Sequence, residues 1–135
     1  MGLGAVVIRG AREQGAAAVE MALILPVLLI VVFGIIDFGS LFNAQISLTQ
    51  AAREGVRLGA IGEATSVEAM EARMQDAYFG IFGSEQPSAV EGSVSCGPEP
   101  DPEDSAELVA SLEFTTPIGR FQPTLTAKAV MRCGG

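Results

Sequence analysis

The apolar residues divide the chain into one long hydrophobic stretch and a following region of short periodic segments. Residues 21–36 read MALILPVLLIVVFGII and contain no charged side chain. Together with residues 16–20 the stretch would be about 31 Å long as a helix, at a rise of about 1.5 Å per residue. A bilayer has a hydrocarbon core of about 30 Å. We therefore predict a transmembrane helix over residues 16–37, within which Pro26 would kink or loosen the backbone.

The same helix is predicted to extend beyond the membrane over residues 38–62, with a break at residues 62–64. The extension contains no proline, and it carries a rough apolar stripe of Phe38, Leu41, Phe42, Leu48 and Ala52. Glycine weakens a helix by about 1 kcal/mol, so repeated glycines need a reason. Close approach of another backbone is one such reason. We expect packing positions at Pro26, Gly34, Gly39, Gly55 and Gly59, against a neighbouring helix or against the chain's own sheet.

A second, amphipathic helix is predicted from about residue 65 to about Phe82. Thr65 and Glu68 have the spacing of a capping box, with Thr65 as the cap. Apolar side chains recur on one helical face at Val67, Met70, Met74, Ala77, Tyr78 and Ile81, while Glu68, Glu71, Arg73 and Asp76 fall mainly elsewhere. The two methionines are typical of a core rather than of a metal site.

After a turn at residues 83–88 the apolar period changes from helical to two. Alternation places Val90, Gly92, Val94 and Cys96 on one face of a first strand, and Leu108, Ala110, Leu112 and Phe114 on one face of a second. A third strand would turn Leu125, Ala127, Ala129, Met131 and Cys133 to the same side. Three antiparallel strands with one buried face follow from this pattern. The fold class is α+β, with an extracytoplasmic α+β domain over residues 63–135.

Both cysteines, Cys96 and Cys133, lie in phase with the apolar face of this sheet. An even number of cysteines in a translocated domain indicates a disulfide, and two buried free thiols are the alternative. A bridge would close a loop of about forty residues and stabilise the domain by about 3–4 kcal/mol.

Charge and composition exclude several classes of function. The net charge is −8, with a single lysine, so nucleic acid is not expected as a partner. Histidine is absent from the sequence, and no metal-ligand spacing or phosphate-binding glycine loop appears. The acidic loop with Glu99, Asp101, Glu103 and Asp104 could suit calcium, but its alternating prolines oppose the curled loop that calcium requires. We expect no enzymatic activity, no cofactor and no metal.

The basic residues indicate the orientation in the membrane. Arg9 and Arg12 precede the apolar stretch, and the next basic residue is Arg53. The positive-inside rule then places the N-terminus in the cytoplasm and the C-terminus outside. An ordinary cleaved signal peptide is the alternative, although no clear A-x-A cleavage site follows the apolar stretch.

Glu20 is the unusual residue of the apolar stretch, because an ionisable group within a membrane segment is costly and is a functional candidate. A cut after Gly15 would give Ala16 a free, positively charged amine about one helical turn from Glu20. The pair could neutralise each other within one chain or between neighbouring chains. Alternatively, Glu20 lies at the headgroup level and is solvated.

The segment from Gly15 to Arg57 resembles the TadE-like family of tight-adherence (Tad) pilus systems. Its matching features are the small residues before Val19-Glu20, the Leu25-Pro26 step, the block Phe33-Gly34-Ile35-Ile36-Asp37-Phe38-Gly39, and Ala51-Ala52-Arg53-Glu54-Gly55. The sequence departs from processed pilins of these systems at Met21, where they often have an aromatic residue.

The resemblance implies that residues 1–15 are a leader removed by a prepilin peptidase, which cuts between Gly15 and Ala16. It also implies that Glu20 acts in processing or in subunit recruitment, and that the protein is a minor pilin or pseudopilin. Its partners would be the peptidase, other pilins, the inner-membrane assembly platform and membrane lipid. The location would be the cytoplasmic membrane or, after assembly, the pilus. A membrane-anchored scaffold or adapter of an envelope complex, outside any filament, is the alternative.

Overall fold

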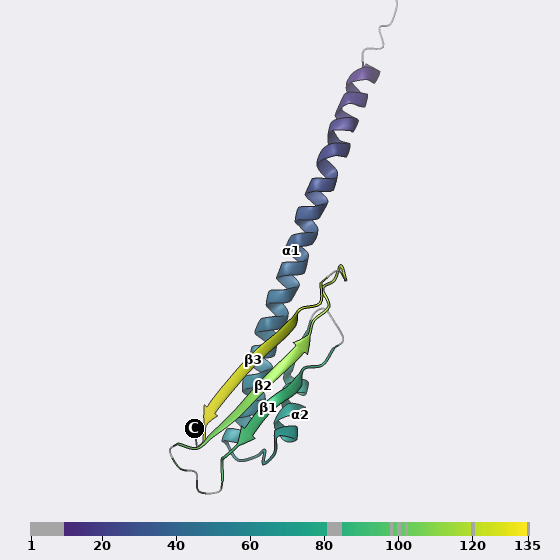
Figure 1. The fold of residues 1–135 in the computed structure, drawn as a ribbon. Helices are drawn as coiled ribbons and strands as arrows, with labels where there is room; N and C mark the ends of the chain where they lie inside the picture. The colour runs from purple at the N-terminus through teal and green to yellow at the C-terminus, as the bar shows by residue number, and fades with distance from the viewer. Residues whose placement is uncertain are drawn as a thin grey trace, which may run out of the picture. The chain divides into compact units, whose positions relative to one another are not determined.

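The computed structural model describes residues 10–80, 85–97, 99, 101, 103–119 and 121–134. The chain divides into two compact units, Met1–Ile35 and Ile36–Gly135. Helix α1, Gly10–Ala60, supplies the described part of the first unit and the opening segment of the second (Figure 1). It is continuous through Pro26 and ends at Ala60. The chain then turns at Gly62, where a φ of +77° favours glycine, so the predicted break is present.

The second unit is an α+β domain, as predicted. Helix α2, Val67–Ala77, is followed by strands β1, Ser88–Val94, β2, Ser105–Glu113, and β3, Thr124–Arg132. The strands form one antiparallel sheet in the order β1-β2-β3. Figure 1 shows α1 and α2 on the same side of this sheet. The core between them contains Leu48, Val56, Met70, Met74, Leu108 and Leu112.

The opposite face of the sheet is mostly polar, with Val109 and Val130 among its polar residues. Lys128 on β3 forms an ion pair of 2.6 Å with Glu107 on β2. The alternation predicted for β2 and β3 is confirmed, because Leu108, Ala110, Leu112 and Phe114 are buried together with Leu125, Ala127 and Ala129. One face of each strand therefore meets the helices and the other meets solvent.

The buried face of α1 differs from the predicted stripe. Phe38 and Phe42 are 65% and 67% exposed, whereas the buried positions are mostly small: Ser40, Ala44, Ala51, Ala52, Gly55 and Gly59, with Leu48 and Val56. Small side chains allow α2 and the sheet to approach the helix axis closely, and the two aromatic rings would prevent this. The prediction that Phe38 and Phe42 share the core stripe was wrong.

Helix α2 begins and ends at other residues than predicted. Ser66, not Thr65, is the N-cap, and its hydroxyl accepts a hydrogen bond from the Ala69 N–H. The helix ends at Ala77 because Tyr78 has extended backbone angles, so it does not reach Phe82. Residues 81–84, which include the predicted stripe residue Ile81, lie outside the described residues.

A β-bulge changes the face that Val90 occupies. Ala89 pairs with Ala110 and Glu91 pairs with Val109, so Val90 is the extra residue between them. Val90 is consequently 60% exposed, and Ala89 takes its predicted place beside the core. Gly92 lies over Val67, where an added Cβ would come within 2.9 Å of a Val67 methyl group.

Candidate functional site

The predicted processing site lies within the first turns of α1. The described side chains from Gly15 to Glu20 are all exposed, and a Cβ added at Gly15 would meet no atom within 4 Å. Ala16 and Glu20 are four residues apart on a continuous helix, and therefore lie about 6 Å apart along its axis on the same face. Arg9 lies outside the described residues, and of residues 10–14 only the helical backbone is described.

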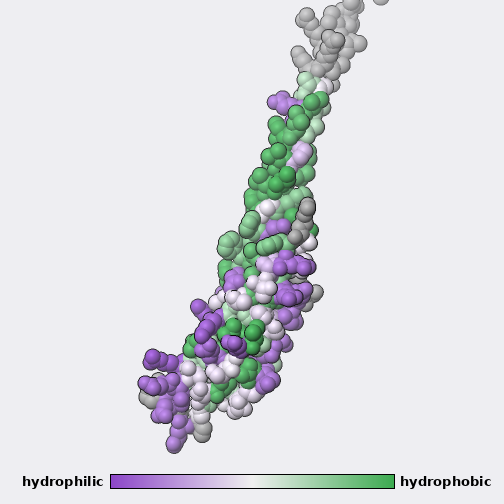
Figure 2. All heavy atoms as spheres, in the orientation of Figure 1, coloured by the Kyte–Doolittle hydropathy of each residue, from purple (hydrophilic) through white to green (hydrophobic). Residues whose placement is uncertain are grey.

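An apolar surface follows the processing site along α1. Large hydrophobic side chains from Val19 to Ile36 are exposed, and Figure 2 shows hydrophobic residues covering this section of the helix. In the part of the chain that the structure describes, α1 is the one helix that is long and apolar enough to cross a membrane. A water-soluble domain would bury such a surface. By length and composition, α1 is therefore consistent with a single-pass membrane anchor.

The glycines of α1 fall into two groups. Gly34 and Gly39 have no atom within 4 Å of an added Cβ. At Gly55 an added Cβ would lie 2.6 Å from the Met70 carbonyl oxygen, and at Gly59 it would lie 2.7 Å from the Met70 sulfur. Gly55 and Gly59 thus allow α2 to cross α1 closely, whereas Gly34 and Gly39 leave open positions that no described residue contacts.

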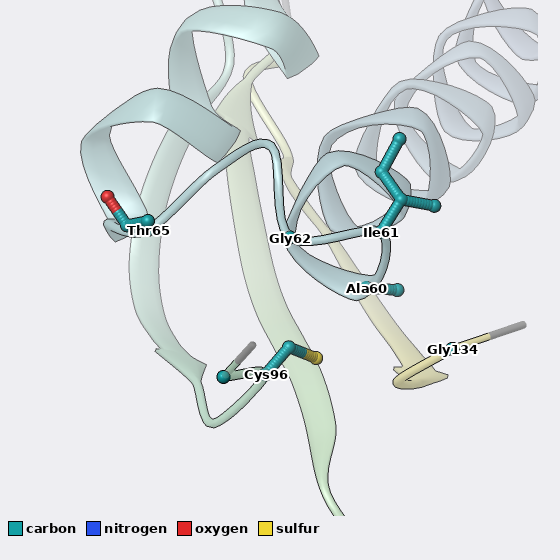
Figure 3. A pocket seen from close by; sticks show the side chains of 7 residues that line it. Ala60, Ile61, Gly62, Thr65, Cys96 and Gly134 are labelled. Atoms are coloured by element: carbon teal, nitrogen blue, oxygen red, sulfur yellow. The ribbon is translucent and has the colours of Figure 1, made fainter. Parts of the chain in front are cut away.

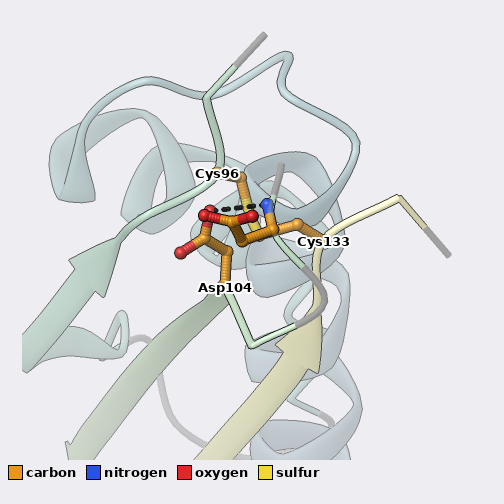
Figure 4. The surroundings of a disulfide bond; sticks show 4 residues. Cys96, Asp104 and Cys133 are labelled. Atoms are coloured by element: carbon orange, nitrogen blue, oxygen red, sulfur yellow. Dashed lines mark hydrogen bonds between the residues drawn. A yellow bond between two sulfur atoms is a disulfide. The ribbon is translucent and has the colours of Figure 1, made fainter. Parts of the chain in front are cut away.

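The predicted disulfide between Cys96 and Cys133 is present, with a Cα–Cα distance of 5.5 Å (Figure 4). Next to it, the Cys133 N–H donates to the Asp104 carbonyl at 3.0 Å and the Gly134 N–H donates to the Ala60 carbonyl at 3.2 Å. These bonds join the C-terminus to the start of β2 and to the last turn of α1. The disulfide therefore fastens the end of the sheet that lies beside the end of α1.

A pocket of about 470 Å³ opens beside this disulfide. Its lining consists of Ala60, Ile61, Gly62, Thr65, Cys96, Gly97 and Gly134 (Figure 3). None of these side chains is charged and only Thr65 carries a hydroxyl, so the pocket offers no pair of groups for acid–base chemistry. Among the described residues, which include Glu99, Asp101, Glu103 and Asp104, no group of three acidic, histidine or cysteine side chains could hold a metal ion.

Most of helix α1 is similar to a known protein family. Residues 15–57 match the TadE-like protein family. This confirms the resemblance seen in the sequence over about a third of the chain. No curated protein and no solved structure matches the chain. The TadE-like segment contains Gly15, Ala16, Glu20, Pro26, Gly34, Gly39 and Gly55, and it ends before Gly59.

The C-terminal end of the matched segment is joined to α2 of the α+β domain by an ion pair. Glu54 accepts a hydrogen bond of 3.0 Å from Arg73 on α2 and lies 3.9 Å from Arg57. Arg73 also binds Asp76 at 3.0 Å. The hydrogen bond that Arg73 donates to Glu54, assisted by the charges of Glu54 and Asp76, raises the pKa of Arg73 despite partial desolvation. One ion pair, between Glu54 and Arg73, thus links α1 to α2 next to the contact made by Gly55.

The sequence did not predict two contacts that α2 makes through polar side chains. Arg73 and Glu71 were assigned to the solvated side of α2, yet Arg73 binds Glu54, and a Glu71 carboxylate oxygen accepts the Ala89 N–H at 3.0 Å. Both partners are distant in the sequence, so periodicity within α2 carried no signal of them. The Glu71 contact satisfies a backbone donor next to the bulge in β1.

Proposed function

We propose that this protein is a minor pilin or pseudopilin of a Tad-type pilus, involved in adherence and acting as a structural or assembly-initiating subunit. The observation that carries the proposal is the position of the family match. It begins at Gly15, the residue before the proposed cut, and continues through Glu20 and the exposed apolar part of α1. Processing, membrane insertion and helix packing would therefore all use the one segment that is typical of the family.

In this account the protein is first a single-pass protein of the cytoplasmic membrane, with its N-terminus inside. A prepilin peptidase removes residues 1–15 and leaves an amine on Ala16. The positive charge of this amine, about one turn from Glu20, offsets the cost of placing a carboxylate in an apolar environment. Pairing between neighbouring chains would set the register in which subunits enter the pilus, and other pilins and the assembly platform would be the partners.

The features of α1 that have no partner in this chain support packing against other helices. Gly34 and Gly39 leave positions at which a neighbouring backbone can approach closely. The outer domain is bulky compared with the short major subunits expected of Tad systems, which favours a minor subunit. Histidine is absent from the sequence, and the pocket beside the disulfide has no charged side chain in its lining. We propose no enzymatic role.

The test is the location of the protein in cells that make pili. Sheared surface filaments and washed membranes are separated, and the chain is measured in both by quantitative mass spectrometry. The proposal predicts the chain in the filament fraction, at a small fraction of the major pilin, and its loss from that fraction for Glu20→Ala. A chain found only in membranes, in piliated cells, would contradict incorporation and would favour the membrane-anchored adapter.

A further inference from the structure

The loop between β2 and β3 is fastened to the point where α1 enters the outer domain. The Ile118 N–H donates to the Asp37 carboxylate at 3.4 Å. Within the loop, the Thr116 N–H donates to the Phe121 carbonyl at 3.2 Å and the Gly119 N–H donates to the Thr116 carbonyl at 2.7 Å. These bonds hold the described residues of the loop, 114–119 and 121–123, and Figure 1 shows this loop at the end of the sheet away from the C-terminus.

This end of the domain exposes large apolar side chains. Ile118 and Phe121 are 40% and 61% exposed, and Phe38, next to Asp37 on α1, is also exposed. The opposite end of β2 leads into exposed carboxylates at Glu99, Asp101 and Glu103. β2 has nine residues, so about 26 Å separates the two ends, at about 3.3 Å per residue. The loop end of the domain, its apolar end, thus exposes large apolar side chains beside Glu85 and Glu113, whereas the described side chains named at the other end are carboxylates.

The apolar end lies at the depth where a bilayer surface is expected. The charge-free stretch of α1 ends at Ile36. The headgroup region adds about 5–7 Å on each side of the hydrocarbon core, which is about four residues of helix. Asp37 lies in that layer, and the loop bound to it through Ile118 lies at the same level.

We propose that the β2–β3 loop is a second membrane contact, with Ile118 and Phe121 inserted at the boundary of headgroups and acyl chains beside α1. This inference rests on α1 spanning the membrane, as in the proposed function. Glu85 and Glu113 are exposed at the same end of the sheet, and the loop itself contains Arg120, which lies outside the described residues. Because these charges are of both signs, the occupant that we propose is zwitterionic lipid. Contact at two points would fix the tilt and rotation of the domain relative to the membrane before assembly.

The absence of tryptophan from the sequence allows a direct test with single reporters. Phe121→Trp reports on the loop, Val31→Trp reports on the apolar part of α1, and Val130→Trp is the exposed control. Val130 lies six residues beyond the start of β3, about 20 Å from the loop. The full chain is reconstituted in phosphatidylcholine vesicles at high dilution, with and without bromine on the acyl chains, which quenches nearby tryptophan.

The proposal predicts quenching and a shift to shorter emission wavelength for Phe121→Trp and Val31→Trp, and neither effect for Val130→Trp. Quenching of Val31→Trp alone would overturn the loop contact and leave the membrane anchor intact. No quenching at either position would overturn the anchor as well. A shift of Phe121→Trp without bromine quenching, growing with protein density, would mean that a second copy covers the loop. Ile118→Trp provides a second reporter if Phe121→Trp misfolds.

Discussion

At the scale of single residues, glycine has two different roles along α1. Gly55 lies against Met70, with no room for a methyl group, whereas Gly39 has open space around it. We expect Gly55→Ala to lower the free energy of unfolding by about 1–3 kcal/mol, because the Met70 carbonyl is backbone and cannot move aside independently.

Gly39→Ala is the matched control in the same helix. It should leave stability unchanged or slightly raised, since alanine favours a helix by up to about 1 kcal/mol over glycine. Thermal unfolding in detergent, followed by circular dichroism, measures both. Equal losses for the two variants would contradict the assigned contacts.

Tyr78, the single tyrosine, gives a pH-dependent test at the same scale. Burial raises the pKa of Tyr78, because the phenolate is less well solvated in the folded domain. The resulting stability is fully present below the unfolded pKa of about 10 and is lost as pH rises through the folded pKa. Titration of phenolate absorbance should give a higher midpoint for folded than for denatured protein, and coincident midpoints would disprove the burial.

At the scale of elements, the bulge in β1 separates two valines that simple alternation places on one face. Val90 is exposed, while Val94 packs against the core opposite Ala106. Val90→Asp should change stability by no more than about 0.5 kcal/mol. Val94→Asp should cost about 1–3 kcal/mol, because it places a carboxylate beside apolar side chains. Urea denaturation of both variants measures the free energy of unfolding. Similar losses for the two variants would contradict the bulge and favour a regular register between β1 and β2.

The same elements show how much the sequence could predict. Regular alternation predicted β2 and β3 and their buried face correctly. The apolar run predicted the first part of α1, and the proline-free stretch after it predicted an extension over residues 38–62, close to the observed end at Ala60. The bulge was missed because regular alternation has no place for an extra residue, and the Ala89 N–H beside it binds Glu71 of α2, a contact between distant parts of the chain. The prediction also placed Phe38 and Phe42 on the buried face of α1 because they are apolar. The face that is buried carries mostly small side chains, which allow closer packing.

At the scale of the whole molecule, the family match covers the helix and not the domain that follows it. The matched segment ends at Arg57, yet its last turns hold the domain through Gly55 against Met70 and Glu54 against Arg73. The segment that matches the family therefore also contributes to the hydrophobic core of the domain. The processing site at Gly15, Glu20 and the roles of Gly34 and Gly39 in assembly stay predictions.

The measurement that tests the central claim most directly is the mature N-terminus of the protein from its native cells. Intact mass and N-terminal sequencing are compared in cells with and without the prepilin peptidase. The account predicts a chain that begins at Ala16, and an uncut chain that keeps residues 1–15 when the peptidase is absent. An uncut chain in the presence of the peptidase, or a start beyond Ile36, would contradict it.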